Sequence, residues 1–236
     1  MTLTEISSGL VIQNIRLPLR LTDFKLIAFD MDSTLINIEC VDEIADEAGK
    51  KAEVAAITEA AMRGEITDYK DSLRRRVALL KGVSVASMDA VYRQRLQLNP
   101  GARALVAACK AAGMKVLLVS GGFTYFTDRI RDELNIDYVR SNVLGTADGL
   151  LTGEMVDQAW GDICDGEEKR KALLQTCASL NILANQAIAM GDGANDLPMM
   201  AVAGLSVAYH AKPAVRAKAM VSINSGGLDR LLEVMA

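Results

Sequence analysis

The chain has 236 residues, half of them apolar, and a net charge of −4, which fits one folded core with a smaller module and excludes a disordered chain. The mildly acidic balance gives no electrostatic reason to expect nucleic acid as a partner. No apolar run reaches the roughly 18 residues of a membrane span, so we expect a cytoplasmic protein with neither nucleic-acid nor membrane partners.

The first chemical pattern follows a short apolar strand. Residues 1–22 carry no catalytic pattern and are too few for an independent regulatory domain. The run Leu26–Phe29 has the length and flanks of a buried strand and leads directly into Asp30-Met31-Asp32-Ser33-Thr34. Carboxylates at such a strand end lie where open α/β sheets bind ligands, and a close pair either raises one pKa or recruits a cation. Taken alone, the motif is also compatible with a polar loop.

The region 39–98 is almost free of strand signals and repeats apolar residues at helical spacing. We therefore expect a small helical bundle, inserted after the first strand and placed as a lid. The alternative is an unusually long crossover between strands, but a crossover usually needs only one helix.

A second pattern follows the next strand. Asn99-Pro100-Gly101 marks the return to the main domain, and the apolar run Val116–Val119 ends in Ser120-Gly121-Gly122, just before a helix expected from about 124. A strand followed by a hydroxyl, two glycines and a helix start can cradle phosphate, because glycine lets backbone N–H groups approach the anion. An isolated Ser-Gly-Gly is more often a tight turn.

A basic helix and a third strand complete the pattern. Short pieces between 140 and 160 predict one or two hairpins. The helix expected at about 167–180 begins with Lys169, Arg170 and Lys171, whose charge opposes the helix dipole and indicates an anionic partner for one of them. The strand Ala187–Met190 then ends in Gly191-Asp192-Gly193-Ala194-Asn195-Asp196. Further strands at 205–208 and 221–223, with helices around 213–219 and 227–235, predict a largely parallel sheet in an α/β fold.

The remaining reactive residue types suggest no other chemistry. The single histidine, His210, argues against a Ser-His-Asp triad or a phosphohistidine and fits a packing or loop role better. The cysteines contain no C-x-x-C pair, which favours buried thiols over a zinc site or disulfides. They are Cys40, Cys109, Cys164 and Cys177.

Parallel strands would bring the three strand ends to one edge of the sheet. Four carboxylates beside a phosphate dianion need a cation among them, and all-oxygen ligands with phosphate favour Mg²⁺. A lysine, Lys169 or Lys171, would supply the remaining positive charge. The combination predicts phosphoryl transfer, in which one Asp attacks phosphorus while a second donates a proton to the leaving alcohol and later takes one from water.

In this order the motifs resemble the four motifs of the haloacid dehalogenase superfamily of phosphotransferases. The resemblance runs from about residue 24 to the C-terminus and rests on Asp30–Thr34, Ser120–Gly122, Lys169 and Gly191–Asp196. It implies a Rossmann-like core at 23–38 and 99–236 and a helical cap at 39–98, with 1–22 as an extension of unknown role.

The resemblance also implies a role for each motif residue. Asp30 would be the nucleophile and Asp32 the general acid/base. The phosphoryl group would be held by Ser120, Gly121, Gly122 and Lys169, with Lys171 as the second candidate for the lysine. Mg²⁺ would be bound by Asp30, the main-chain carbonyl of Asp32 and Asp192, with Asn195 and Asp196 in support.

Two cap segments, 37–45 and 72–77, are similar to those of superfamily members that act on O-phospho-L-serine in the last step of serine synthesis. That substrate presents an ammonium and a carboxylate beyond its phosphate, which Glu39 and Arg76 could bind. Read alone, both residues would be ordinary surface charges. Met62 and Tyr69 match the family's apolar cap wall and would also fit a core.

Two other functions stay open. One is a phosphatase or phosphotransferase acting on another small phosphomonoester such as phosphohomoserine. The other is a non-catalytic phosphometabolite-binding protein on the same fold, against which the full acidic set argues, because binding alone needs no Asp aimed at phosphorus. The sequence leaves a homodimer open.

Overall fold

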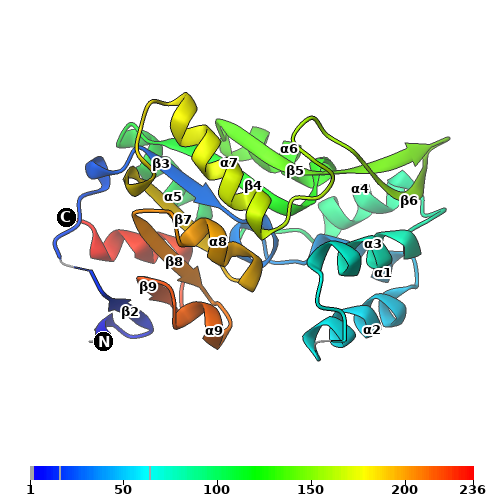
Figure 1. Ribbon diagram of the computed structural model, residues 1–236, viewed down its shortest axis with the longest axis horizontal. Coiled ribbons are helices and arrows are strands. Elements are labelled where there is room, and N and C mark those ends of the chain that lie inside the picture. Colours follow the sequence, from blue (N-terminus) through cyan, green and yellow to red (C-terminus); the bar gives the residue numbers. More distant parts are fainter. Residues whose placement is uncertain (1–2, 16, 64) are drawn as a thin grey trace.

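The structure is a computed structural model that describes residues 3–15, 17–63 and 65–236, without the side chain of Met62. Within these residues it is a mixed α/β fold, whose nine strands form one sheet in the order β1-β2-β9-β8-β7-β3-β4-β5-β6 (Figure 1). The strands are β1 (Leu3–Ser7), β2 (Leu10–Gln13), β3 (Leu26–Phe29), β4 (Lys115–Phe123), β5 (Tyr138–Ala147), β6 (Leu150–Val156), β7 (Ala187–Gly191), β8 (Leu205–Tyr209) and β9 (Val221–Ile223).

The centre of the sheet is parallel, which confirms the α/β prediction. Strand β3 pairs in parallel with β4 and β7, and parallel pairing continues to β5 on one side and through β8 to β9 on the other. Both edges are antiparallel, because β6 folds back on β5 and the hairpin β1–β2 lies on β9. The N-terminal segment, whose role the sequence left unknown, therefore adds two strands to the sheet.

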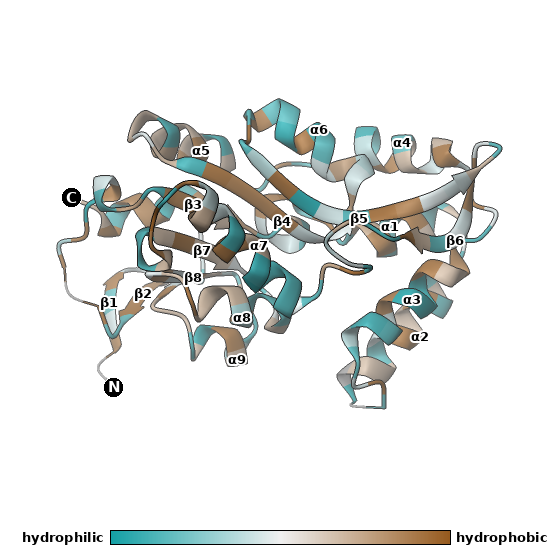
Figure 2. Ribbon diagram, turned by 45° about the horizontal axis from the view of Figure 1, so that its top comes forward, coloured by the Kyte–Doolittle hydropathy of each residue, from teal (hydrophilic) through white to brown (hydrophobic). Residues whose placement is uncertain are grey.

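Strand β3 is buried on both faces, as a central parallel strand should be. Successive side chains of a strand point to opposite faces, so Ile27 and Phe29 join one hydrophobic core while Leu26 and Ala28 join the other. The central strands are accordingly among the most hydrophobic segments in Figure 2. This double burial fixes the end of β3, where Asp30 begins.

Helices cover both faces of the sheet. One face carries α5 (Ala102–Ala111) and α6 (Thr124–Leu134), and the other carries α7 (Gly166–Ser179), α8 (Leu197–Met200) and α9 (Pro213–Arg216). Shorter turns are η1 (Leu21–Asp23), η2 (Met31–Leu35), η3 (Ala184–Gln186) and η4 (Ala194–Asp196). None of the helices formed by the described residues is both long enough and apolar enough to cross a membrane.

The last two predicted helices differ from the structure. The helix expected at 213–219 ends at Arg216, and the one expected at 227–235 is the 3₁₀ helix η5 (Leu228–Val234). Its buried side chains, Leu228, Leu231 and Val234, are three residues apart. A 3₁₀ helix has three residues per turn, so this geometry turns all three toward the core.

Between residues 40 and 94 the described part of the chain forms four helices, which we call the helical insertion. They are α1 (Cys40–Glu47), α2 (Lys51–Met62), α3 (Tyr69–Leu79) and α4 (Val85–Gln94). The chain enters and leaves the insertion along two segments that lie side by side. The Asn37 N–H donates to the Gln97 carbonyl at 3.0 Å, and the Asn99 N–H donates to the Leu35 carbonyl at 2.9 Å. The insertion is therefore joined to the sheet next to the Asp30 motif.

Candidate active site

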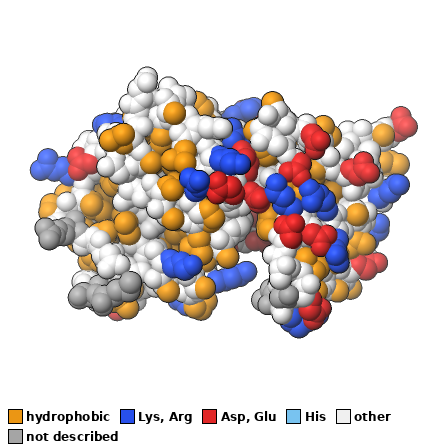
Figure 3. Space-filling view, in the orientation of Figure 1, with side chains coloured by type: hydrophobic (Ala, Val, Ile, Leu, Met, Phe, Trp, Pro, Cys, Tyr) orange, Lys and Arg blue, Asp and Glu red, His pale blue; other side chains and the backbone are white. Residues whose placement is uncertain are grey.

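A cavity of about 530 Å³ lies between the carboxyl ends of β3, β4 and β7 and the helical insertion. The surface is hollowed between the part that holds α9 and the part that holds α2 (Figure 3). The walls of the cavity include ten of the residues that the sequence predicted for the site: Asp30, Asp32, Glu39, Tyr69, Arg76, Ser120, Gly121, Gly122, Asp192 and Asn195. The fold thus brings the separate motifs to one place.

Lys169 is fully buried between two carboxylates next to this cavity. Its Nζ donates to Asp30 Oδ1 at 2.6 Å and to Asp196 Oδ1 at 2.7 Å. Burial alone would lower the pKa of the ammonium, but the charges of Asp196 and Asp30 raise that pKa well above its usual value. Lys171 is exposed on the same helix. The anionic partner expected for one base of this helix start is therefore found at Lys169.

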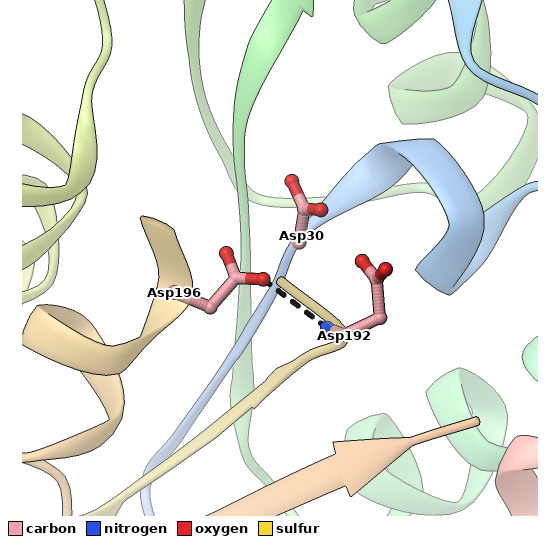
Figure 4. Close-up of side chains that lie close together, drawn as sticks. All are labelled: Asp30, Asp192 and Asp196. Atoms are coloured by element: carbon pink, nitrogen blue, oxygen red, sulfur yellow. Dashed lines mark hydrogen bonds between the residues drawn. The ribbon is translucent and has the colours of Figure 1, made fainter. Parts of the chain in front are cut away.

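Three carboxylates surround one small space. Asp30, Asp192 and Asp196 each offer an oxygen within 4.8 Å of the others (Figure 4). Burial and the neighbouring acids raise the pKa of Asp30 well above its usual value, against the opposing charge of Lys169, and raise the pKa of Asp192 to about 7. One lysine does not neutralise three acids, so this all-oxygen cluster fits a hard cation such as Mg²⁺.

Asp196 organises the loop after β7. Its Oδ2 accepts the N–H of Asp192 at 3.1 Å and the N–H of Gly193 at 3.0 Å, and Figure 4 shows the first of these bonds. A Cβ on Gly191 would lie 2.3 Å from the Asp196 carboxyl carbon, so glycine is required for this close approach. Because Asp196 already accepts three hydrogen bonds, from Lys169 and the loop, Asp30 and Asp192 have more acceptor positions left for a cation.

Asp32 is held by a residue from the start of α1. The Cys40 N–H donates to its Oδ2 at 3.0 Å and the Cys40 thiol donates to its Oδ1 at 3.2 Å. Burial, followed by the charge of Glu39, raises the pKa of Asp32 to about 7, although the two bonds from Cys40 oppose the shift. A carboxyl with this pKa can hold and release a proton near neutral pH.

Ser33 connects the Asp30 motif to Glu39. It has a left-handed backbone, with φ of 57°, which turns the chain sharply after Asp32. Its hydroxyl donates to Glu39 Oε1 at 2.6 Å. The turn therefore places the Glu39 carboxylate on the wall of the cavity, close to the predicted acid/base residue.

The Ser120-Gly121-Gly122 segment, which belongs to β4 rather than to a loop after it, lies under α3. The Gly122 N–H donates to Ser120 Oγ at 2.8 Å, and Ser120 is fully buried. A Cβ on Gly121 would lie 2.1 Å from the Tyr69 hydroxyl oxygen, so a side chain there would collide with the insertion. Tyr69 is thus placed directly over the Ser-Gly-Gly segment that is predicted to hold phosphate.

Two polar atoms of the insertion point to a missing partner. Arg76 Nε and Asp42 Oδ1 are buried and have no hydrogen-bond partner among the described residues, and both side chains line the cavity. Burial raises the pKa of Asp42, while the charge of Arg76 opposes the shift. Unpaired buried polar groups cost about 1–3 kcal/mol each, so these atoms favour a ligand with charges of its own.

The sequence analysis missed Asp42 and the contact made by Cys40. Asp42 comes three residues after Glu39, and i,i+3 spacing on a helix could have indicated a shared face. The Cys40 contact has no such signal, because it forms across the turn at Ser33. Buried thiols as such were predicted, and Cys40, Cys109, Cys164 and Cys177 are all free and buried.

Two further residues named in the sequence analysis are Met62 and His210. Met62 ends α2, but its side chain is outside the part of the chain that the structure describes. His210 follows β8 and packs against the ring of Tyr209 with centroids 4.3 Å apart. It does not line the cavity, in agreement with the packing or loop role expected for it.

Known proteins resemble this chain in both sequence and structure. Residues 27–201 match the sequence profile of haloacid dehalogenase-like hydrolases. The chain is 80% identical to a phosphoserine phosphatase of Polaromonas sp. and 73% identical to one of Albidiferax ferrireducens, in each case over 98% of both chains. A solved substrate-bound phosphoserine phosphatase complex is 37% identical, with a TM-score of 0.82, over 90% of this chain and 99% of that one. The chain therefore belongs to the haloacid dehalogenase-like hydrolase family.

Proposed function

We propose that this enzyme is a phosphoserine phosphatase, a phosphoric monoester hydrolase that converts O-phospho-L-serine to L-serine and phosphate. The near-full-length relatives of that name support this proposal. The observation that carries it is that Glu39 and Arg76 line the same cavity as Asp30. A small substrate in that cavity meets an acid for its ammonium and a base for its carboxylate while its phosphate reaches Asp30.

In the first step an Asp30 oxygen attacks phosphorus in line. The new O–P bond forms as the bond from phosphorus to the serine oxygen breaks. Asp32 gives its proton to the departing oxygen, and its pKa of about 7 lets it carry that proton near neutral pH. The products of this step are free serine and an aspartyl-phosphate on Asp30.

In the second step the ionised Asp32 takes a proton from water. The water oxygen attacks the aspartyl-phosphate, the bond between phosphorus and the Asp30 oxygen breaks, and phosphate leaves. Ser120, Gly121, Gly122 and Lys169 would hold the phosphoryl oxygens throughout. The insertion, with Tyr69 over Gly121, would act as the cap that limits access of bulk water.

The acidic cluster supports Mg²⁺ as cofactor, because its oxygens lie within 4.8 Å of one another and are only partly neutralised. Asp30, Asp192 and the main-chain carbonyl of Asp32 would hold the ion, with Asn195 and Asp196 in support. When bound, it would neutralise charge on the transferred phosphoryl group.

The same proposal covers the domain boundaries, the cellular location and the oligomeric state. The core would comprise 23–38 and 99–236 and the cap 39–98, and the enzyme would act in the cytoplasm at the last step of serine synthesis. A homodimer stays a prediction.

The test compares phosphate release from O-phospho-L-serine, O-phosphothreonine, a sugar phosphate and an aryl phosphate, with Mg²⁺ and with chelator. We expect kcat/KM for phosphoserine to exceed the others by about tenfold or more, and chelator to abolish all turnover. Turnover of the other phosphates while phosphoserine is ignored would keep the phosphatase chemistry and reject the substrate. Turnover that is unaffected by chelator would reject the cofactor.

A further inference from the structure

We propose that Asn142 is a positioning residue for phosphate binding, acting through the peptide between Gly121 and Gly122. Asn142 lies on β5 and is fully buried. Its Nδ2 donates to the Gly121 carbonyl at 2.7 Å, and its Oδ1 accepts the Cys164 N–H at 2.8 Å. It does not line the cavity, so it would act on substrate only through the groups that it holds.

The need for such a contact comes from a break in the sheet. Strands β4 and β5 pair in register up to Val119 opposite Arg140, and the next pair is Phe123 opposite Asn142. Between these two pairs the chain moves four residues along β4 but only two along β5. The intervening Ser120-Gly121-Gly122 therefore has no paired residue on β5. The side chain of Asn142 supplies the hydrogen bond that the ladder lacks there.

This contact fixes the direction of one peptide dipole. The carbonyl of Gly121 and the N–H of Gly122 belong to a single planar peptide and point in opposite directions. The carbonyl is held by Asn142, and the N–H is held by Ser120 Oγ at 2.8 Å. Because Ser120 Oγ accepts this N–H, its own hydroxyl proton stays available for a phosphate oxygen.

The amide oxygen of Asn142 connects to the start of α7, the helix that carries Lys169. Cys164 immediately precedes Asp165, whose side chain caps α7 by accepting the Glu168 N–H at 2.8 Å. Lys169 follows in the first turn of that helix. One rigid amide therefore sets the Ser-Gly-Gly segment and the start of the Lys169 helix relative to each other, because its planar group carries both a donor and an acceptor.

The chain offers a matched control on the same strand. Ser141 is the preceding residue of β5, is also buried, and makes a 2.7 Å hydrogen bond with Thr127. Successive strand residues point to opposite sides. Ser141→Ala therefore removes a buried hydrogen bond but leaves the contact of Asn142 with the Ser-Gly-Gly segment in place.

The experiment measures KM and kcat for O-phospho-L-serine, the inhibition constant of inorganic phosphate, and Tm in Asn142→Asp, Asn142→Ala and Ser141→Ala. Asn142→Asp keeps the acceptor for Cys164 but turns an anion toward the Gly121 carbonyl. We expect KM and the phosphate inhibition constant to rise together by about tenfold or more in both Asn142 variants and to stay unchanged in Ser141→Ala. Tm should fall in all three variants, because each loses a buried hydrogen bond, and most in Asn142→Asp, which places a carboxyl group in a fully buried position.

Equal constants in the Asn142 and Ser141 variants would overturn the proposal. Loss of folding in both Asn142 variants would also overturn it, because the amide would then be required for the fold itself. The kinetic readout rests on the proposed function, whereas binding of inorganic phosphate by calorimetry does not. If the wild-type protein bound phosphate without hydrolysing phosphoserine, and Asn142→Asp weakened that binding, the proposed function would fail while this inference stood.

Discussion

Lys169 shows how much the site depends on charges that are held away from water. It is fully buried and its two partners, Asp30 and Asp196, are almost equally inaccessible. Pairing of this kind is costly to break, because removing one member leaves the other charges buried without compensation.

Replacing Lys169 by Met should therefore destabilise the fold and stop catalysis. We expect a loss of about 3–5 kcal/mol in the free energy of unfolding and a fall of kcat by about 10³ or more. Urea unfolding and phosphate release measure the two effects. Lys171→Met, an exposed position on the same helix, is the control, and equal losses in the two variants would refute the assignment.

Asp32 gives the folded protein a pH dependence with a defined sign. Its pKa rises from 3.8 to about 7 on folding, so the folded state keeps a proton that the unfolded chain releases as pH rises through this window. Stability from this group is then lost with increasing pH. With chelator present, the wild-type free energy of unfolding should fall by about 1–3 kcal/mol relative to Asp32→Asn between about pH 4.5 and pH 8. Urea unfolding at both pH values tests this, and a constant difference would contradict it.

Among the elements, α3 both lines the cavity and contacts the segment before α7. One side of it lines the cavity with Tyr69 and Arg76. Another side pairs with the segment before α7, since Lys70 Nζ lies 2.9 Å from Asp162 Oδ1 and Arg74 bonds to the same carboxylate. The ion pairs therefore anchor the helix that places Arg76 in the wall of the cavity.

Substrate selectivity can be tested on two adjacent arginines of α3. Arg76→Ala should reduce kcat/KM for phosphoserine by about 10²-fold while changing that for an aryl phosphate, which has no carboxylate, by less than about threefold. Arg75→Ala is the control, because Arg75 is exposed and pairs only with Asp71 in its own helix among the described residues. Equal losses on both substrates in Arg76→Ala would favour another phosphomonoester.

At the scale of the whole molecule, the parallel core was predictable from short apolar runs such as Leu26–Phe29, because buried strands need continuous hydrophobic residues. The acids at the strand ends were predictable as well, because they directly follow these apolar runs. The roles of Cys40 and Asn142 were not predictable, since they arise from contacts between segments that only the fold brings together. For Asp42 the sequence offered only its i,i+3 spacing from Glu39. Likewise, the sequence indicated a strand at 116–119 but not that β4 continues to Phe123 through an interrupted ladder.

Cation binding should be visible in the stability of the whole protein. A ligand present at 100 times its Kd stabilises the folded state by about 2.7 kcal/mol, so saturating Mg²⁺ should raise Tm above its value in chelator. The shift should disappear in Asp192→Asn, which removes one of the acids within 4.8 Å of each other. Differential scanning calorimetry measures both, and an equal shift in the variant would exclude this cluster as the cation site.

The most direct test of the account compares phosphate release from O-phospho-L-serine by the wild-type protein and by Asp30→Asn in Mg²⁺, with circular dichroism to verify the fold of both. The variant removes the attacking oxygen and leaves the side chain nearly the same size. We predict rapid release by the wild type and a loss of about 10⁴-fold or more in the variant. Substantial turnover by folded Asp30→Asn, or a wild-type protein inert toward phosphoserine, would contradict the account.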